Sequence, residues 1–189
     1  MSLRHGLLGL LAEGPASGYD LAGHFQRMLG PVWPAQHPKI YAELARLADE
    51  GLIEVDSLGP RGRKAYRITE AGLAEVRRWL SDGDVDHTLR LEPLLRSFFF
   101  WLMPPEDLDA HLAREEEFFA STAAAYREYA AAKDRGEFGD APHTKSARIA
   151  IEAGVRLYQA LADWAAWARD QDPGHQETAP AATKPEPRP

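Results

Sequence analysis

QHPKIYAELARLADEGLIEVDSLGPRGRKAYRI, residues 36–68, is the stretch that decides the fold of this chain. Three apolar residues in its first half are spaced by four and three, the spacing of one face of a helix: Ile40, Leu44 and Leu47. Pro38 suits the first helical position, and Gly51 can adopt the left-handed conformation that ends a helix. The stretch is therefore expected to open with a helix over residues 36–50.

A hairpin is expected after this helix. Leu52–Asp56 and Lys64–Ile68 are short strand-like runs, and the glycines and proline of residues 57–63 are typical of the turn between them. Between Ser57 and Ile68 there are four basic residues and no acidic one. A helix followed by a hairpin with a cationic tip is typical of a winged helix, in which the helix reads the major groove of DNA and the wing contacts flanking phosphates.

Helices are also expected on both sides of this stretch. Their ranges are 2–12, 17–29 and 69–81, and on the last of them Leu73, Val76 and Leu80 repeat on one face. The connector Val32-Trp33-Pro34 is interpreted as an aromatic plug over the end of the small core. The order helix, helix, helix, strand, strand, helix predicts a winged helix-turn-helix domain over residues 1–82, with the third helix as the reader.

The second half of the chain has a different character. LRLEPLLRSFFFWLM, residues 89–103, is too apolar to face water on any broad side, and long helices are expected at about 105–133 and 145–169. Such helices bury their surface poorly alone, so residues 89–170 are predicted to form a helical dimerisation domain. Residues 173–189 are proline-rich without aromatics and are expected to be a disordered tail. The predicted fold class is mainly α.

Charge and composition limit the function classes. The net charge is −7, but residues 1–82 hold ten basic and ten acidic residues, so the deficit lies in the second half and the first half is compatible with DNA. The chain has no cysteine, no apolar run near the length of a membrane span and no visible signal peptide, which predicts a cytoplasmic protein without membrane association. No catalytic ordering of residues or phosphate-binding loop stands out, so neither enzyme activity nor a cofactor is expected.

Candidate DNA-binding residues lie on the reading helix and the wing. They are Gln36, His37, Lys39, Tyr41, Ala42, Arg46, Arg61, Arg63 and Lys64. The alternative interpretation is an ordinary solvated helix face and a solvated turn, with His37 as a capping residue. Arg67 leaves the wing, and pairing with an acid is its alternative role.

An aromatic run in the second half is a candidate ligand or dimer interface. Its members are Phe98, Phe99, Trp101 and Leu102. It could line a pocket for a small aromatic effector, although packing in a core or dimer interface is the commoner use of such a run. His111 and Glu115 lie one helical turn apart, but two ligands without a third are weak evidence for metal, and no metal site is expected.

The first half also resembles a known family. LRHGLLGLLAEGPASGYDLAGHF from Leu3, the connector at residues 32–34, KIYAELARLADEGLIEV from Lys39 and RKAYRITEAG from Arg63 closely resemble the PadR family of bacterial transcriptional regulators. The length and helix order of the second half are similar to the carboxy-terminal domain of virulence regulators in that group. The resemblance implies a homodimer on a roughly palindromic operator, usually a repressor, in some members released by a small aromatic compound. Relatives often have small hydroxyl or histidine residues at the start of the reading helix, where this chain has Gln36-His37-Pro38. Because of this departure, the resemblance implies no base preference for this chain.

Two other functions remain open. The weakly basic reading helix and the acidic chain also fit a winged-helix adaptor that binds protein rather than DNA. A protein whose aromatic second half binds a ligand as its main function is the other alternative.

Overall fold

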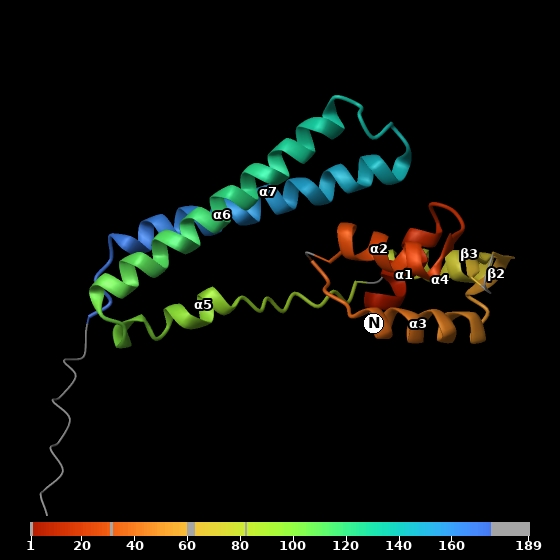
Figure 1. Cartoon of the computed structure of the whole chain (residues 1–189), viewed down its shortest axis with the longest axis horizontal. Coiled ribbons are helices and arrows are strands. Elements are labelled where there is room, and N and C mark those ends of the chain that lie inside the picture. Colours follow the sequence, from red (N-terminus) through yellow and green to blue (C-terminus); the bar gives the residue numbers. More distant parts are fainter. Residues whose placement is uncertain (1, 31, 60–62, 82, 175–189) are drawn as a thin grey trace, which may run out of the picture. The chain divides into compact units, whose positions relative to one another are not determined.

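A computed structural model describes residues 2–30, 32–59, 63–81 and 83–174. The chain divides into two compact units, Met1–His87 and Thr88–Pro189, which are described separately below as unit 1 and unit 2. Most described residues are helical, and one small three-stranded sheet accompanies them (Figure 1). The predicted mainly α fold class with a winged helix is therefore confirmed. None of the helices in the described ranges is long and apolar enough to cross a bilayer.

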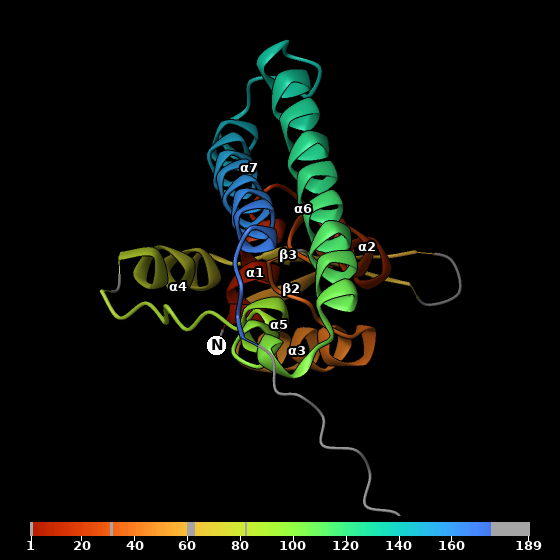
Figure 2. The same cartoon turned by 90° about the vertical axis from the view of Figure 1, so that its left-hand side faces the viewer.

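Unit 1 has the predicted order of elements with one addition. The elements are α1 (Ser2–Leu11), β1 (Ala16–Ser17), α2 (Gly18–Met28), α3 (His37–Asp49), β2 (Ile53–Leu58), β3 (Lys64–Ile68) and α4 (Glu70–Ser81). The strands pair antiparallel in the order β1-β3-β2. Figure 2 shows β2 and β3 as the long hairpin of this sheet. All four helices and β2 contribute to one apolar core.

Helix α3 is held in unit 1 by its apolar stripe. Ile40, Leu44 and Leu47 are at most 1% exposed, as their spacing predicted. Gln36 precedes the helix in an extended conformation, Pro38 lies in its first turn, and Gly51 follows it with φ of 72°. Because the buried stripe fixes the rotation of α3 about its axis, it also fixes which side chains face outward.

The two-residue strand β1 was not predicted, because two residues carry no periodic pattern. It pairs with β3 in the register Ala16↔Tyr66 and Ser17↔Ala65. Ser17 also caps α2, since its hydroxyl accepts a hydrogen bond from the Asp20 amide at 3.2 Å. The pairing therefore joins the start of α2 directly to the base of the wing.

The interpretation of the aromatic connector as a plug was wrong. Val32 is 75% and Trp33 46% exposed, so the connector does not plug the core. Ala35 packs against the core instead, and the Gln26 side chain donates a hydrogen bond to the Ala35 carbonyl. Leu80 is 70% exposed, because α4 buries its other end, where Gly72 and Val76 meet the core. Spacing alone did not reveal where along α4 this contact ends.

Unit 2 is organised around a pair of long antiparallel helices. Its elements are α5 (Glu92–Ser97), the short 3₁₀ helix η2 (Phe100–Leu102), α6 (Pro105–Asp134) and α7 (Pro142–Arg169). Helices α6 and α7 lie side by side along much of their length (Figures 1 and 2). At Gly154 they approach closely: a Cβ there would lie 2.8 Å from the Tyr126 ring, which stacks on Tyr158. The absence of a side chain at Gly154 therefore permits close packing of the two helices.

Candidate nucleic-acid interface

The outer face of α3 is the first part of the candidate interface. Lys39, Ala42 and Arg46 are exposed and spaced by three and four, so they share the side of the helix opposite the buried stripe. Gln36 and His37 are exposed at the amino-terminal end of α3. Arg46 lies 3.5 Å from the Glu43 carboxylate, whereas Lys39 makes no ion pair with any described residue. The face is therefore accessible and carries a small positive charge.

Tyr41 has a structural role as well as an exposed edge. A Cβ at Gly18 would lie 2.9 Å from its Cε1 atom, so the ring packs against the first residue of α2. The Tyr41 side chain is still 46% exposed. Tyr41 therefore helps to set the angle between α2 and α3, the two helices of the helix-turn-helix, while part of its ring faces solvent.

The wing contributes the second part of the interface, and one of its cations is engaged within unit 1. Arg63 Nη2 donates to Asp20 Oδ2 at 2.5 Å and to Ser17 Oγ at 2.8 Å. The Ser17 hydroxyl itself donates to Asp20 Oδ2 at 2.8 Å. This hydrogen bond lowers the pKa of the Asp20 carboxyl, and the contact with Arg63 lowers that pKa further.

The other wing residues differ in their surroundings. Lys64 is exposed and forms no ion pair with a described residue, and Arg61 lies outside the described residues. Arg67 lies 2.8 Å from Glu54 and 3.9 Å from Asp56, which confirms its alternative role as the partner of an acid. Among the described wing residues, Lys64 is thus the cation most available to a phosphate.

Asp20 and Ser17 were not identified as site residues from the sequence. A serine followed three residues later by an acid is a recognisable helix-start signal, and it predicts the cap on α2. The contact with Arg63 depends on the pairing of β1 with β3, which no local pattern announces. The sequence therefore predicted where α2 starts, but it did not predict which wing residue meets that start.

The aromatic run of unit 2 is largely exposed. Phe98 is 76%, Phe99 53%, Leu102 59% and Trp101 41% exposed, and only Phe100 of this segment is buried in the core with Leu108 and Leu112. His111 lies edge-on to the Phe100 ring. In the part of the chain that the structure describes, no three histidine or acidic residues are placed to hold a metal ion.

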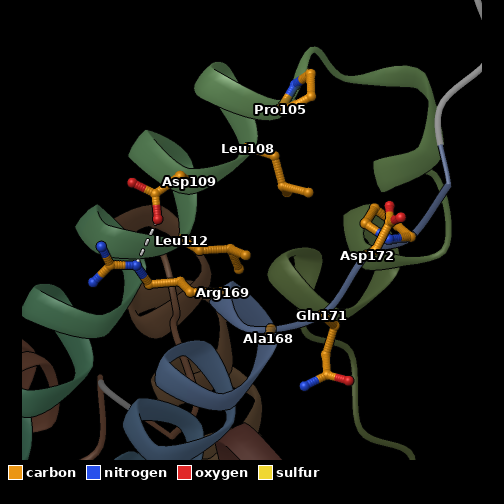
Figure 3. A pocket seen from close by; sticks show the side chains of 9 residues that line it. Pro105, Leu108, Asp109, Leu112, Ala168, Arg169, Gln171 and Asp172 are labelled. Atoms are coloured by element: carbon orange, nitrogen blue, oxygen red, sulfur yellow. Dashed lines mark hydrogen bonds and ion pairs between the residues drawn. The ribbon is translucent and has the colours of Figure 1, made fainter.

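A cavity of about 330 Å³ lies in unit 2 between the start of α6 and the end of α7 (Figure 3). Leu108, Leu112 and Ala168 give it an apolar side, and Arg169 lies at its edge. The Arg169 guanidinium is 2.8 Å from Asp109 and 3.2 Å from Glu116, so two carboxylates already neutralise it. The four residues proposed from the sequence as a ligand or dimer interface are not in its lining.

Each of the two units matches a known protein family. Residues 7–78 match the transcriptional regulator PadR-like family, and residues 89–171 match the virulence activator alpha C-terminal family. The chain is 37% identical over 101 residues to the negative transcriptional regulator PadR of Bacillus subtilis, which is 51% of this chain and 56% of that protein. The matched segments span about half the length of the curated relatives.

Solved structures show the same fold over more of the chain. The structure of Bacillus subtilis PadR with operator DNA has a TM-score of 0.79 at 21% identity and covers 89% of this chain and 98% of that one. The same protein with p-coumaric acid gives a TM-score of 0.75 at 23% identity, with 89% and 97% covered. The fold of unit 1, with helices α1 to α4, and the helical fold of unit 2 are thus each shared with these structures.

Proposed function

Because the chain belongs to the PadR-like family of transcriptional regulators, we propose that it is a sequence-specific DNA-binding protein that acts as a homodimeric repressor on a palindromic operator. The observation that carries this proposal is the outer face of α3, where Lys39, Ala42 and Arg46 stand exposed on a helix fixed to the core by its opposite side. A reading helix must present accessible side chains in a fixed orientation. The Bacillus subtilis relative with this fold was solved with operator DNA.

A mobility-shift assay with the DNA upstream of the chain's own coding region tests the proposal. Retardation is expected at low salt and, for an operator fragment, also at physiological salt, where phosphate contacts alone bind weakly. A scrambled duplex of the same length is the control. If no upstream fragment is retarded at either salt concentration, the proposal is wrong. Protection mapping of a retarded fragment would then give the half-site spacing.

Dimerisation through unit 2 is supported by its exposed apolar side chains. Phe98, Phe99 and Leu102 are more than half exposed, and so are Phe118 and Trp167 on the two long helices. This is more apolar surface than an isolated helical hairpin usually leaves in water. We expect sedimentation equilibrium to give twice the chain mass of 21.0 kDa, and a monomer at micromolar concentration would contradict this part of the proposal.

A wing cation should supply affinity without sequence preference. We predict that Lys64→Ala weakens binding to operator and scrambled duplexes by a similar factor and lowers the salt slope by about one unit, because one phosphate contact is lost. Binding curves at several salt concentrations measure both quantities. Lys145→Ala, which removes an exposed lysine of unit 2, is the matched control and should leave the slope unchanged. An unchanged slope for Lys64→Ala would exclude Lys64 from the interface.

A second candidate function is a winged-helix adaptor that binds protein. The even charge balance of residues 1–82 favours it, because most DNA-binding domains are clearly basic. The mobility-shift assay separates the two functions, since an adaptor would not retard upstream DNA.

A small aromatic effector is the remaining part of the proposal. The exposed Phe98, Phe99 and Trp101 support it, and the Bacillus subtilis relative was solved with p-coumaric acid. Titration of planar aromatic acids should quench tryptophan fluorescence and release bound DNA at the same concentrations. Quenching without release would indicate a site that does not regulate DNA binding.

A further inference from the structure

Arg63 at the base of the wing is held by the start of α2. Its Nη2 atom donates to Asp20 Oδ2 at 2.5 Å and to Ser17 Oγ at 2.8 Å, so both hydrogens of that nitrogen are used. Ser17 is 5% exposed and is fixed by its place in β1 and by the cap on α2. The Ser17 hydroxyl also donates to Asp20 Oδ2. The acceptor side of this contact is therefore built rigidly, on a strand and on a helix start.

The arginine is in turn brought there by the sheet. Ser17 is paired with Ala65 in the β1–β3 ladder, which places residue 63 beside the amino-terminal end of α2. The Arg63 and Asp20 side chains remain 53% and 56% exposed. An ion pair this accessible to water is weak and can be exchanged for another partner.

DNA phosphate offers arginine the same geometry that a carboxylate does, since both accept from the guanidinium fork. Both two-nitrogen forks of the guanidinium, Nε with Nη2 and Nη1 with Nη2, include Nη2, whose hydrogens are donated to Asp20 and Ser17. While this contact holds, a phosphate can accept only from a single nitrogen, Nε or Nη1. Asp20 and a phosphate therefore compete for bidentate binding to Arg63.

We propose that Asp20 competes with DNA phosphate for Arg63 and so lowers the affinity of the winged-helix unit for DNA of any sequence. This inference rests on the proposed DNA-binding function. The competition does not involve the base contacts expected of α3. The affinity that is lost therefore belongs to the phosphate contacts, which are independent of DNA sequence. Asp20 thus limits retention on non-operator DNA, which always outnumbers operator sites.

A double-mutant cycle on the full chain tests the competition. The wild type, Asp20→Asn, Arg63→Ala and the double variant are titrated with a duplex of arbitrary sequence at several salt concentrations. Asp20→Asn should bind about three- to tenfold more tightly with a salt slope steeper by about 0.9, the value of one more phosphate contact. In the Arg63→Ala background, Asp20→Asn should change neither quantity. Glu13→Gln removes an exposed charge that lines the same surface groove as Asp20, and it should have little effect.

The opposing results are distinct. If Asp20→Asn bound DNA more weakly than the wild type, Asp20 would position Arg63 for DNA. If Asp20→Asn raised the DNA affinity equally in the Arg63→Ala background, Asp20 would act by general repulsion of DNA. Either result would overturn the proposed competition. If no variant binds any duplex, the proposed function itself fails. Titration of the Asp20 carboxyl by NMR in the free protein tests the ion pair without DNA. Arg63→Ala should raise the pKa of Asp20, because the contact with Arg63 lowers that pKa. An unchanged pKa would overturn the ion pair independently of DNA.

Discussion

Gly72→Ala should destabilise unit 1 by about 3 kcal/mol or more, because the added methyl group has no space to enter. A Cβ at residue 72 would lie 2.1 Å from the Leu52 carbonyl oxygen and 2.8 Å from Ile68 Cγ1. The nearer atom belongs to the backbone, so a change of rotamer cannot relieve the overlap. The Leu52 carbonyl is also fixed, since it accepts a hydrogen bond from the Thr69 amide at 3.1 Å. Helix α4 would have to move away from the start of β2.

Such a movement would also break the start of α4. The Thr69 hydroxyl accepts from the Gly72 amide at 3.1 Å and donates to the Gly51 carbonyl at 2.8 Å, which ties α4 to the end of α3. The end of the reading helix would therefore lose a support. We expect faster hydrogen exchange in α1, α3 and α4 and a lower urea midpoint for unit 1, with exchange in α6 and α7 unchanged.

Gly9→Ala is the matched control for Gly72→Ala. Gly9 lies in α1, and a Cβ there would meet nothing within 4 Å. The substitution should stabilise unit 1 by about 0.5 to 1 kcal/mol, the usual gain of replacing glycine by alanine in a helix. If Gly72→Ala were as stable as Gly9→Ala, the close approach of α4 to Leu52 would be wrong.

These two glycines show how far the sequence alone could be interpreted. The stripe of Ile40, Leu44 and Leu47 predicted both α3 and its buried side, because helix periodicity is a local property. The close approach at Gly72 is a contact between segments twenty residues apart, and no periodicity reports it. The same limit explains why Asp20 was missed as the partner of Arg63.

Composition was a poor guide where exposure depends on neighbouring elements. Trp33 was expected to cover the core because it is large and aromatic, but Ala35 packs against the core instead and about half of Trp33 remains exposed. The run around Phe98 was correctly expected to exceed what unit 2 can bury alone. In the candidate interface, residue type and spacing were enough to predict the outer face of α3. The partners of Arg63 and Arg67 could not be predicted in this way, because they depend on how the strands pair.

Ala42→Glu should lower DNA affinity by at least about a hundredfold, since like charges brought together in an interface cost several kcal/mol. Ala42 is exposed and lies between Lys39 and Arg46 on the outer face of α3. In the major groove, a glutamate at this position would face two rows of phosphates and would cancel the charge of one neighbouring cation. Its longer side chain would also hold the helix away from the base edges.

The fold should tolerate this substitution, which makes the loss specific to binding. Glutamate is a good helix former, and residue 42 makes no contribution to the core of unit 1. The urea midpoint and far-UV circular dichroism should therefore stay within error of the wild type. Fluorescence anisotropy with the upstream duplex measures the affinity directly.

Ala74→Glu is the charge-matched control, because residue 74 is an exposed alanine of α4 in the same unit. It adds the same charge to the winged-helix unit without touching α3, so any loss that it causes measures the general effect of net charge. We expect a loss of less than about threefold, since separated surface charges are screened by salt. If Ala42→Glu and Ala74→Glu lowered the affinity equally, the outer face of α3 would not be the surface that enters the groove. If Ala42→Glu instead lowered the affinity a hundredfold more than Ala74→Glu, DNA reading would be assigned to the outer face of α3, opposite the buried stripe.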